Sequence, residues 1–194
     1  NIAVGNWQYR YGYILKRLYE VTRSREYLIK AIETFEDSAE SAQKLDLISR
    51  VAESNWKIAQ TYDALGKHLK AAESFTLASN NYKAAAEKIP QLKDLYQDLS
   101  LYMQAWNEIE KARHHHTKQE YGIAEEHFDK AADLHKSLKQ WNYLAPNYAA
   151  WARVEHAEEM SRKEQSEEAI QAFEQAANLF NETRKSLQTK LSEI

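Results

Sequence analysis

Apolar residues recur at helical spacing along the chain, and short polar clusters interrupt them at fairly even intervals. Ala105, Trp106, Ile109 and Ala112 fall on one face of a helix, as expected for an amphipathic segment with a buried side. The interruptions divide the chain into eight expected helices of roughly 20 residues, each about 30 Å long. They lie at residues 22–25, 44–46, 65–67, 89–90, 116–118, 139–140 and 162–166.

The second half of the chain contains an internal repeat. A shift of 45 residues places the apolar positions of residues 105–134 on those of residues 150–179. The matched pairs are Ala105-Trp106 with Ala150-Trp151, Ile109 with Val154, Ala112 with Ala157, Ala124 with Ala169, Phe128 with Phe173, Ala131-Ala132 with Ala176-Ala177, and Leu134 with Leu179. Because these positions occupy one face of each of two successive helices, the repeat unit is expected to be a helical hairpin.

Four copies of this hairpin are recognisable. The second helix of each carries a Phe anchor flanked by small residues, and the first helix carries a Trp that we expect in the core. The anchors are Phe35, Phe75, Phe128 and Phe173, and the first-helix residues are Trp7, Trp56, Trp106 and Trp151. The predicted fold is an all-α solenoid of four antiparallel hairpins at about 7–43, 46–88, 91–138 and 141–191, in a single domain covering residues 1–194.

Some helix ends carry recognisable signals. Thr117-Lys-Gln-Glu120 has the pattern of a capping box at a helix start, and Gly66 suits a left-handed residue at a helix end. Pro146 is expected near the start of the seventh helix, where a missing amide hydrogen costs little. The pairs Glu125-Glu126 and Glu167-Glu168 are expected at helix starts, where negative charge interacts favourably with the helix dipole.

The second-helix pattern resembles the tetratricopeptide repeat, in which a small residue, an aromatic and another small residue follow at spacings of four and three. Ala71-Phe75-Ala78, Ala124-Phe128-Ala131 and Ala169-Phe173-Ala176 match that order. The anchors are 40, 53 and 45 residues apart, whereas the family repeats every 34 residues, and the closing Pro is missing. The long hairpins are similar to divergent arrays such as the soluble NSF attachment proteins of vesicle fusion. This resemblance implies a groove that binds a protein or peptide.

Composition and charge narrow the function classes. Only 4 Gly and 2 Pro occur, which leaves little room for the turns of a β-sheet. A net charge of -3 with interspersed signs argues against nucleic-acid binding. No Cys is present, which suits a cytoplasmic protein, and no apolar run is long enough to span a membrane. Since the chain begins at Asn1 without Met, we expect an excised segment or processed product.

Candidate chemistry is sparse. His114, His115 and His116 are consecutive, so on a helix they cannot converge on one metal ion, and we expect them to form a basic helix end. Neither Glu-x-x-His nor His-Glu-x-x-His occurs, and four scattered glycines cannot form a phosphate loop. The sequence therefore predicts no metal site, no cofactor and no catalytic residues, and it leaves the oligomeric state open.

The sequence favours a non-enzymatic scaffold or adaptor that holds a protein or peptide in the groove of the solenoid. The candidate groove residues are polar positions of the first helices, namely Gln60, Asp63, Asn107, Glu110, Lys111, His114 and Glu155. Two alternatives are a regulatory or sensory module of a larger protein and a trafficking adaptor similar to the attachment proteins. The aromatic segment from Trp7 to Tyr13 must expose some rings, either for binding or for packing on a preceding segment.

Overall fold

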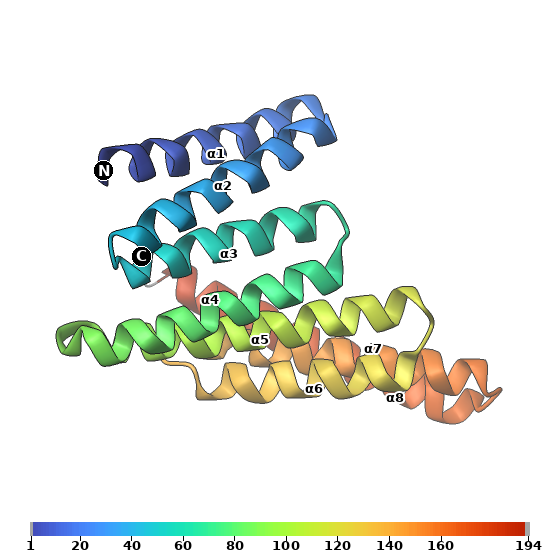
Figure 1. The fold of residues 1–194 in the computed structure, drawn as a ribbon. Helices are drawn as coiled ribbons and strands as arrows, with labels where there is room; N and C mark the ends of the chain where they lie inside the picture. Colours follow the sequence, from blue (N-terminus) through green and yellow to red (C-terminus); the bar gives the residue numbers. More distant parts are fainter. Residues whose placement is uncertain (1, 193–194) are drawn as a thin grey trace. The chain divides into compact units, whose positions relative to one another are not determined.

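A computed structural model describes residues 2–192 and confirms an all-α fold for them (Figure 1). Within that range there are eight α-helices, as predicted, two short 3-10 turns and no strand. The helices are α1 (Ile2–Thr22), α2 (Arg25–Lys44), α3 (Ile48–Ala64), α4 (His68–Lys88), α5 (Lys93–Thr117), α6 (Tyr121–Ser137), α7 (Ala145–Arg162) and α8 (Ser166–Ser192). The 3-10 turns, Pro90–Leu92 and Asn142–Leu144, precede α5 and α7. No helix in the described range is long and apolar enough to cross a bilayer.

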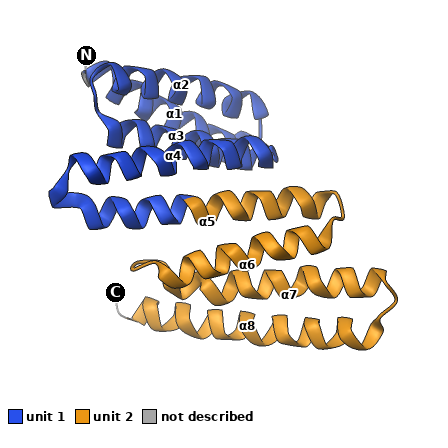
Figure 2. Cartoon of the chain, turned by 60° about the horizontal axis from the view of Figure 1, so that its bottom comes forward, with its two compact units in different colours: residues 1–103 blue, residues 104–194 orange. Residues whose placement is uncertain are grey.

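The chain divides into two compact units, Asn1–Met103 and Gln104–Ile194, and the boundary in the sequence falls within α5 (Figure 2). In each unit, consecutive helices pack against one another, consistent with a helical repeat. The single domain expected over residues 1–194 stays a prediction.

Unit 1 is held by an apolar core between α1, α2 and α3. Phe35 is fully buried there, together with Leu15, Leu28 and Ile58. Gly12 faces the Phe35 ring so closely that a Cβ atom at residue 12 would lie 2.7 Å from Cε1 of Phe35. Helices α1 and α2 therefore approach closely because residue 12 carries no side chain.

Unit 2 has an equivalent core between the second half of α5, α6 and α7. Ile109 of α5, Phe128 of α6 and Ala152 of α7 are buried in it. Two small residues, Ala112 and Ala131, are fully buried in the same cluster, and small side chains of this kind leave room for the Phe128 ring. The predicted anchors Phe35, Phe75 and Phe128 are thus confirmed as core residues.

The fourth anchor and two of the four Trp residues are not in the core. Phe173 is 42% exposed, Trp151 is 41% exposed and Trp7 is 63% exposed, so these three predictions were wrong. Each of these residues belongs to the apolar face of its own helix, α1, α7 or α8. Within the described part of the chain, no neighbouring helix covers any of the three side chains completely. Periodicity identifies an apolar face and does not show what packs on it.

Most of the short links between helices share one backbone conformation. Five of them contain a residue with left-handed backbone: Arg23, Asp46, Gly66, Gln119 and Glu164. In four, an amide after this residue donates to a carbonyl five residues earlier, as Lys67 N–H does to Tyr62 at 2.9 Å. Gly66, with a φ of 71°, confirms the predicted left-handed helix end.

The other predicted helix ends had mixed outcomes. Pro146 lies in the first turn of α7 and Glu167-Glu168 in the first turn of α8, as predicted. The capping box at Thr117–Glu120 was wrong: Thr117 is the last residue of α5, and its hydroxyl donates to the carbonyl of His114. Helix α6 begins only at Tyr121 and has no side-chain cap, so Glu125-Glu126 lies beyond its first turn.

Candidate binding surfaces

A pocket of about 250 Å³ lies between α5, α6 and α7 in unit 2. Helix α5 contributes Ile109, Arg113 and His116, and helix α7 contributes Tyr148, Trp151 and Glu155. Both sets follow three- and four-residue spacing, so each forms one side of a helix facing the pocket. Phe128 of α6 completes the lining.

Glu155 is the most unusual group in this pocket because it is a carboxylate that is only 1% exposed. Nδ1–H of His116 donates to both of its oxygens, at 2.8 Å and 3.1 Å. Burial raises the pKa of Glu155 above its ordinary value, and the hydrogen bond from His116 offsets part of that shift.

A second carboxylate, Glu110, is fully buried beside the pocket. It accepts a hydrogen bond of 3.0 Å from Nη1 of Arg113, which lies one turn further along α5. The Arg113 guanidinium therefore has a carboxylate partner of its own, apart from Glu155.

Three aromatic side chains, Phe128, Tyr148 and Trp151, form an aromatic wall of the same pocket. The rings of Phe128 and Trp151 stack with centroids 6.1 Å apart, and Trp151 and Phe180 of α8 form a T-shaped contact with centroids 5.7 Å apart. Tyr148 stacks at 4.5 Å on His135, whose side chain is fully buried. These contacts hold the ring positions, so the wall is formed before any ligand arrives.

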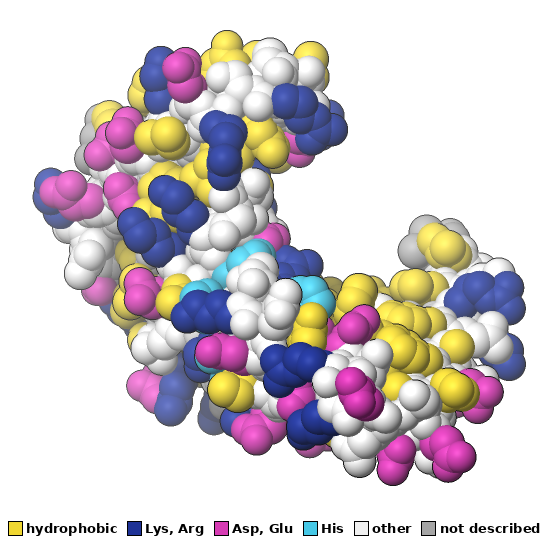
Figure 3. Space-filling model, turned by 90° about the vertical axis from the view of Figure 1, so that its right-hand side faces the viewer, with side chains coloured by type: hydrophobic (Ala, Val, Ile, Leu, Met, Phe, Trp, Pro, Cys, Tyr) yellow, Lys and Arg dark blue, Asp and Glu magenta, His cyan; other side chains and the backbone are white. Residues whose placement is uncertain are grey.

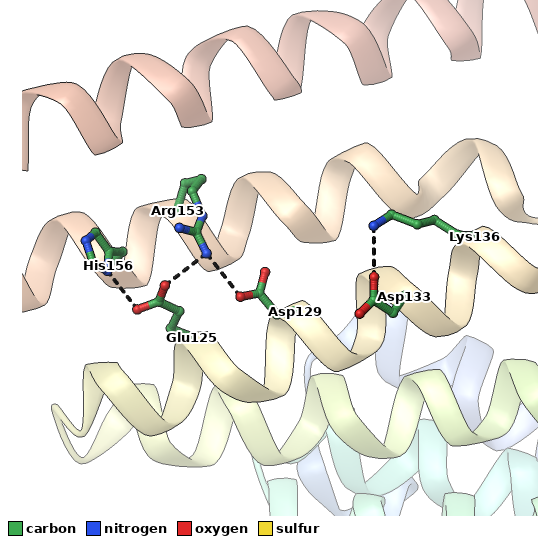
Figure 4. Close-up of polar contacts among 6 residues, drawn as sticks. All are labelled: Glu125, Asp129, Asp133, Lys136, Arg153 and His156. Carbon is green, nitrogen blue, oxygen red and sulfur yellow. Dashed lines mark hydrogen bonds and ion pairs between the residues drawn. The ribbon is translucent and has the colours of Figure 1, made fainter.

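A chain of ion pairs links α6 and α7 beside the pocket (Figure 4). Arg153 of α7 donates to Glu125 at 2.9 Å and to Asp129 at 3.0 Å, both on α6. His156, one turn further along α7, lies 2.9 Å from the other oxygen of Glu125. The network fixes the register of the two helices that carry the aromatic wall.

In unit 1, the outer face of α1 carries an exposed apolar stripe, which we call the α1 stripe. Its members follow alternating three- and four-residue spacing: Val4, Trp7, Tyr11, Ile14, Leu18 and Val21. All six are exposed, from 38% at Leu18 to 83% at Val21. The rings of Trp7 and Tyr11 stack at 5.3 Å. This confirms that the aromatic segment from Trp7 to Tyr13 presents rings to solvent.

The α1 stripe has a basic border. Arg10 and Arg17 are exposed, lie seven residues apart and follow its edge, while the opposite side of the helix packs on α2. On the face drawn in Figure 3, acidic and basic side chains are interspersed. The stripe is therefore an apolar surface bordered by Arg10 and by Arg17, which pairs with Glu20 of the same helix.

The seven predicted groove residues divide by burial. Gln60, Asp63, Lys111 and His114 are partly exposed, whereas the other three, Asn107, Glu110 and Glu155, are buried. The unit 2 pocket brings Glu155 together with Arg113, the partner of Glu110. The α1 stripe was not predicted as a continuous surface, although the three- and four-residue spacing of its apolar residues is visible in the sequence. The predicted basic helix end at His114–His116 is confirmed in the last turn of α5, but the sequence did not show that His116 also lines a pocket. Trp151, predicted in the core, lines the same pocket.

The array of packed helices is consistent with a helical repeat, which is the coarser part of the resemblance noted from the sequence. The finer part, a likeness to the tetratricopeptide or attachment-protein families, stays a prediction from the sequence. No protein-family model, no curated protein and no solved structure matches the chain.

Proposed function

We infer that the chain is a non-enzymatic scaffold that holds a partner protein, and that the α1 stripe is the surface that holds it. The observation that carries this proposal is the row of six exposed apolar side chains at three- and four-residue spacing. That spacing is the seam that one helix presents to another.

The physical argument is the cost of leaving this surface in water. An isolated exposed apolar side chain is common in proteins, but a continuous stripe along a whole helix is not. From Val4 to Val21 the stripe extends for about 26 Å at the standard helical rise. An amphipathic helix of similar length would cover it by inserting its own side chains between these six.

Charge at the border indicates the kind of helix. Arg10 would face a flanking position of a docked helix, where an acidic residue pairs best with it, whereas Arg17 already has Glu20 as a partner. Glu20 is the one acidic residue of α1 (Ile2–Thr22), and it already pairs with Arg17 of its own helix, so a second copy of α1 would bring no uncommitted carboxylate to Arg10. The expected partner is therefore an acidic amphipathic helix of another protein.

The two alternatives from the sequence, a sensory module and a trafficking adaptor, would also use such a surface, and the partner's identity distinguishes them. The tetratricopeptide resemblance supports protein binding in general. A cytoplasmic location stays a prediction from the sequence.

The test combines partner capture with site-specific cross-linking. We would place the photo-cross-linker p-benzoylphenylalanine at Tyr11, in the stripe, and at Leu77, an exposed leucine of α4. After exposure to native lysate, mass spectrometry of the cross-linked peptides identifies the segment bound at each position. The expected result is one amphipathic, acidic helical segment cross-linked at residue 11 and absent at residue 77.

A double variant, Ile14→Glu with Val21→Glu, should lose this capture, whereas Leu77→Glu should retain it. Light scattering of the purified chain would detect self-association through the same stripe. Cross-links at residue 11 to a second copy, to a segment without that pattern, or to no protein would overturn the assignment.

A further inference from the structure

The unit 2 pocket combines a buried carboxylate with an aromatic wall, and neither the α1 stripe nor the proposed docking requires it. Glu155 is 1% exposed, and the rings of Phe128, Tyr148 and Trp151 line the same space. We propose that this pocket binds one organic cation, an alkylammonium, quaternary ammonium or guanidinium group, between the Glu155 carboxylate and the Trp151 ring.

The charges around the pocket favour a cation. The Arg113 guanidinium already has a carboxylate partner, Glu110, at 3.0 Å. Nδ1 of His116 lies 2.8 Å from Oε1 of Glu155, and this pair is an ion pair only if the imidazole is protonated. Glu125 and Glu158 add further negative potential at Glu155. A carboxylate ligand would meet this negative potential in a site of low dielectric.

Glu155 also has capacity for a second partner. A carboxylate offers about four lone-pair positions, and the single Nδ1–H of His116 occupies part of them. A ligand N–H or a methylated ammonium could therefore approach the carboxylate while His116 stays in place.

The rings supply the second half of the site. A cation over the face of Trp, Tyr or Phe is attracted by the ring quadrupole, most strongly for Trp. Trp151 is 41% exposed and lies at the entrance, whereas Phe128 and Tyr148 are buried behind it. The contacts of Trp151 with Phe128 and Phe180 hold its ring in position.

The size of the pocket limits the ligand. Its volume of about 250 Å³ is below the range of roughly 300–1,000 Å³ that is typical of pockets for drug-sized ligands. A single cationic head group fits this volume. It could belong to a small amine or to a methylated lysine or arginine side chain of a protein, since both present the same chemistry.

The test uses choline and its neutral isostere 3,3-dimethyl-1-butanol, which has the same shape but a carbon in place of the charged nitrogen. Isothermal titration calorimetry, supported by saturation-transfer NMR, should detect choline and show binding of the isostere at least about tenfold weaker. Equal binding of both compounds, or no binding of choline, would overturn the proposal.

Variants on α7 locate the site. Glu155→Gln keeps the shape of the side chain and removes its charge, so choline binding should fall about tenfold or more. Trp151→Leu should weaken it similarly. Glu159→Gln is the matched control, because Glu159 lies on the same helix, outside the pocket lining, and pairs with Arg162 and Lys163. Unchanged binding in both pocket variants would contradict the site, and circular dichroism would verify that each variant is folded.

Further titrations distinguish the ligand sources. A short peptide containing trimethyllysine that binds more tightly than choline would indicate a protein side chain, and the reverse order a small molecule. The Ile14→Glu, Val21→Glu variant should bind choline like the wild type. If docking on the α1 stripe were disproved, choline binding in the unit 2 pocket would be unaffected. If choline failed to bind, the docking proposal would likewise be unaffected.

Discussion

His116 at the end of α5 and Glu155 on α7 are joined by a hydrogen bond of 2.8 Å between Nδ1 and Oε1. The carboxylate is buried, and its burial raises the pKa of Glu155 despite the neighbouring imidazole. This pair connects two helices whose contacts could not be assigned from spacing alone. The direction of the pKa shift of Glu155 also predicts whether this group stabilises or destabilises the folded chain as pH rises.

Glu155→Gln should change how stability depends on pH. Because the folded-state pKa of Glu155 is raised, the folded chain binds more protons than the unfolded chain between the ordinary value of 4.5 and the raised value. The contribution of Glu155 to the free energy of unfolding therefore falls as pH rises through this window. Urea denaturation of both proteins over a pH series should show the wild type losing stability relative to the variant as pH rises. Parallel pH profiles would refute this.

His135 should have the opposite dependence. Its side chain is fully buried and donates from Nδ1 to the carbonyl of Ala131 at 2.8 Å. Burial lowers the pKa of His135, so near pH 6.5 and below it the unfolded chain binds more protons than the folded chain. Stability should then be lost as pH falls, by at most about 1.4 kcal/mol per pH unit.

In His135→Gln this loss should be smaller, because the amide can replace the donor but does not titrate in that range. Thermal unfolding of both proteins between about pH 7 and 5 measures the difference. An equal loss in the two proteins would assign the acid sensitivity to other groups.

Two glycines should respond in opposite ways to alanine. In Gly12→Ala, the new Cβ would meet the buried Phe35 ring at 2.7 Å, and the expected loss of stability is about 1–3 kcal/mol. In Gly122→Ala, no atom lies within 4 Å of the new Cβ, and the reduced freedom of the unfolded chain should stabilise the protein by up to about 1 kcal/mol.

Chemical denaturation of the two variants beside the wild type tests both directions at once. If Gly12→Ala proved neutral, α1 and α2 would have to separate easily. The close packing of Gly12 against Phe35 would then contribute little to unit 1.

The Arg153 network should matter more than an ordinary surface ion pair. Arg153→Met leaves Glu125 and Asp129 facing each other without their shared cation, and burial already raises the pKa of Asp129. The expected loss of stability is about 1–2 kcal/mol. Lys136→Met is the matched control, since the Lys136–Asp133 pair on α6 is mostly exposed (Figure 4) and should change stability by less than about 0.5 kcal/mol.

Salt provides a second measurement for this network. Raising the ionic strength to about 1 M shortens the Debye length to roughly 3 Å and should reduce the difference between the two variants. Equal losses in Arg153→Met and Lys136→Met at low salt would show that the network is only a surface feature.

Much of the fold was predictable from the amino-acid sequence. The eight helices follow from apolar spacing and breaker clusters, and Phe35, Phe75 and Phe128 are buried as their flanking small residues indicated. These features are local, because helical periodicity and the spacing of small residues depend only on residues within one or two helical turns of one another. The left-handed link at Gly66 was predicted for the same reason.

The turns at Asp46, Gln119 and Glu164 have the same left-handed backbone without glycine, so residue type did not reveal them. Glu155 was identified as a candidate, but as an exposed groove residue and not as a buried group paired with His116. Helical spacing orders the residues around one helix, and it contains no information about the neighbour that faces them.

Tertiary structure therefore decided which apolar faces are covered and which remain open. Phe128 and Phe173 occupy equivalent positions in the repeat, yet the first is buried against α5 and α7 and the second is 42% exposed. Trp151 likewise became part of a pocket wall, because residues of α5, α6 and α7 converge around it. The sequence by itself determined the helices and their apolar faces. Burial and binding surfaces depend on contacts between segments distant in the chain, which only the packed structure specifies.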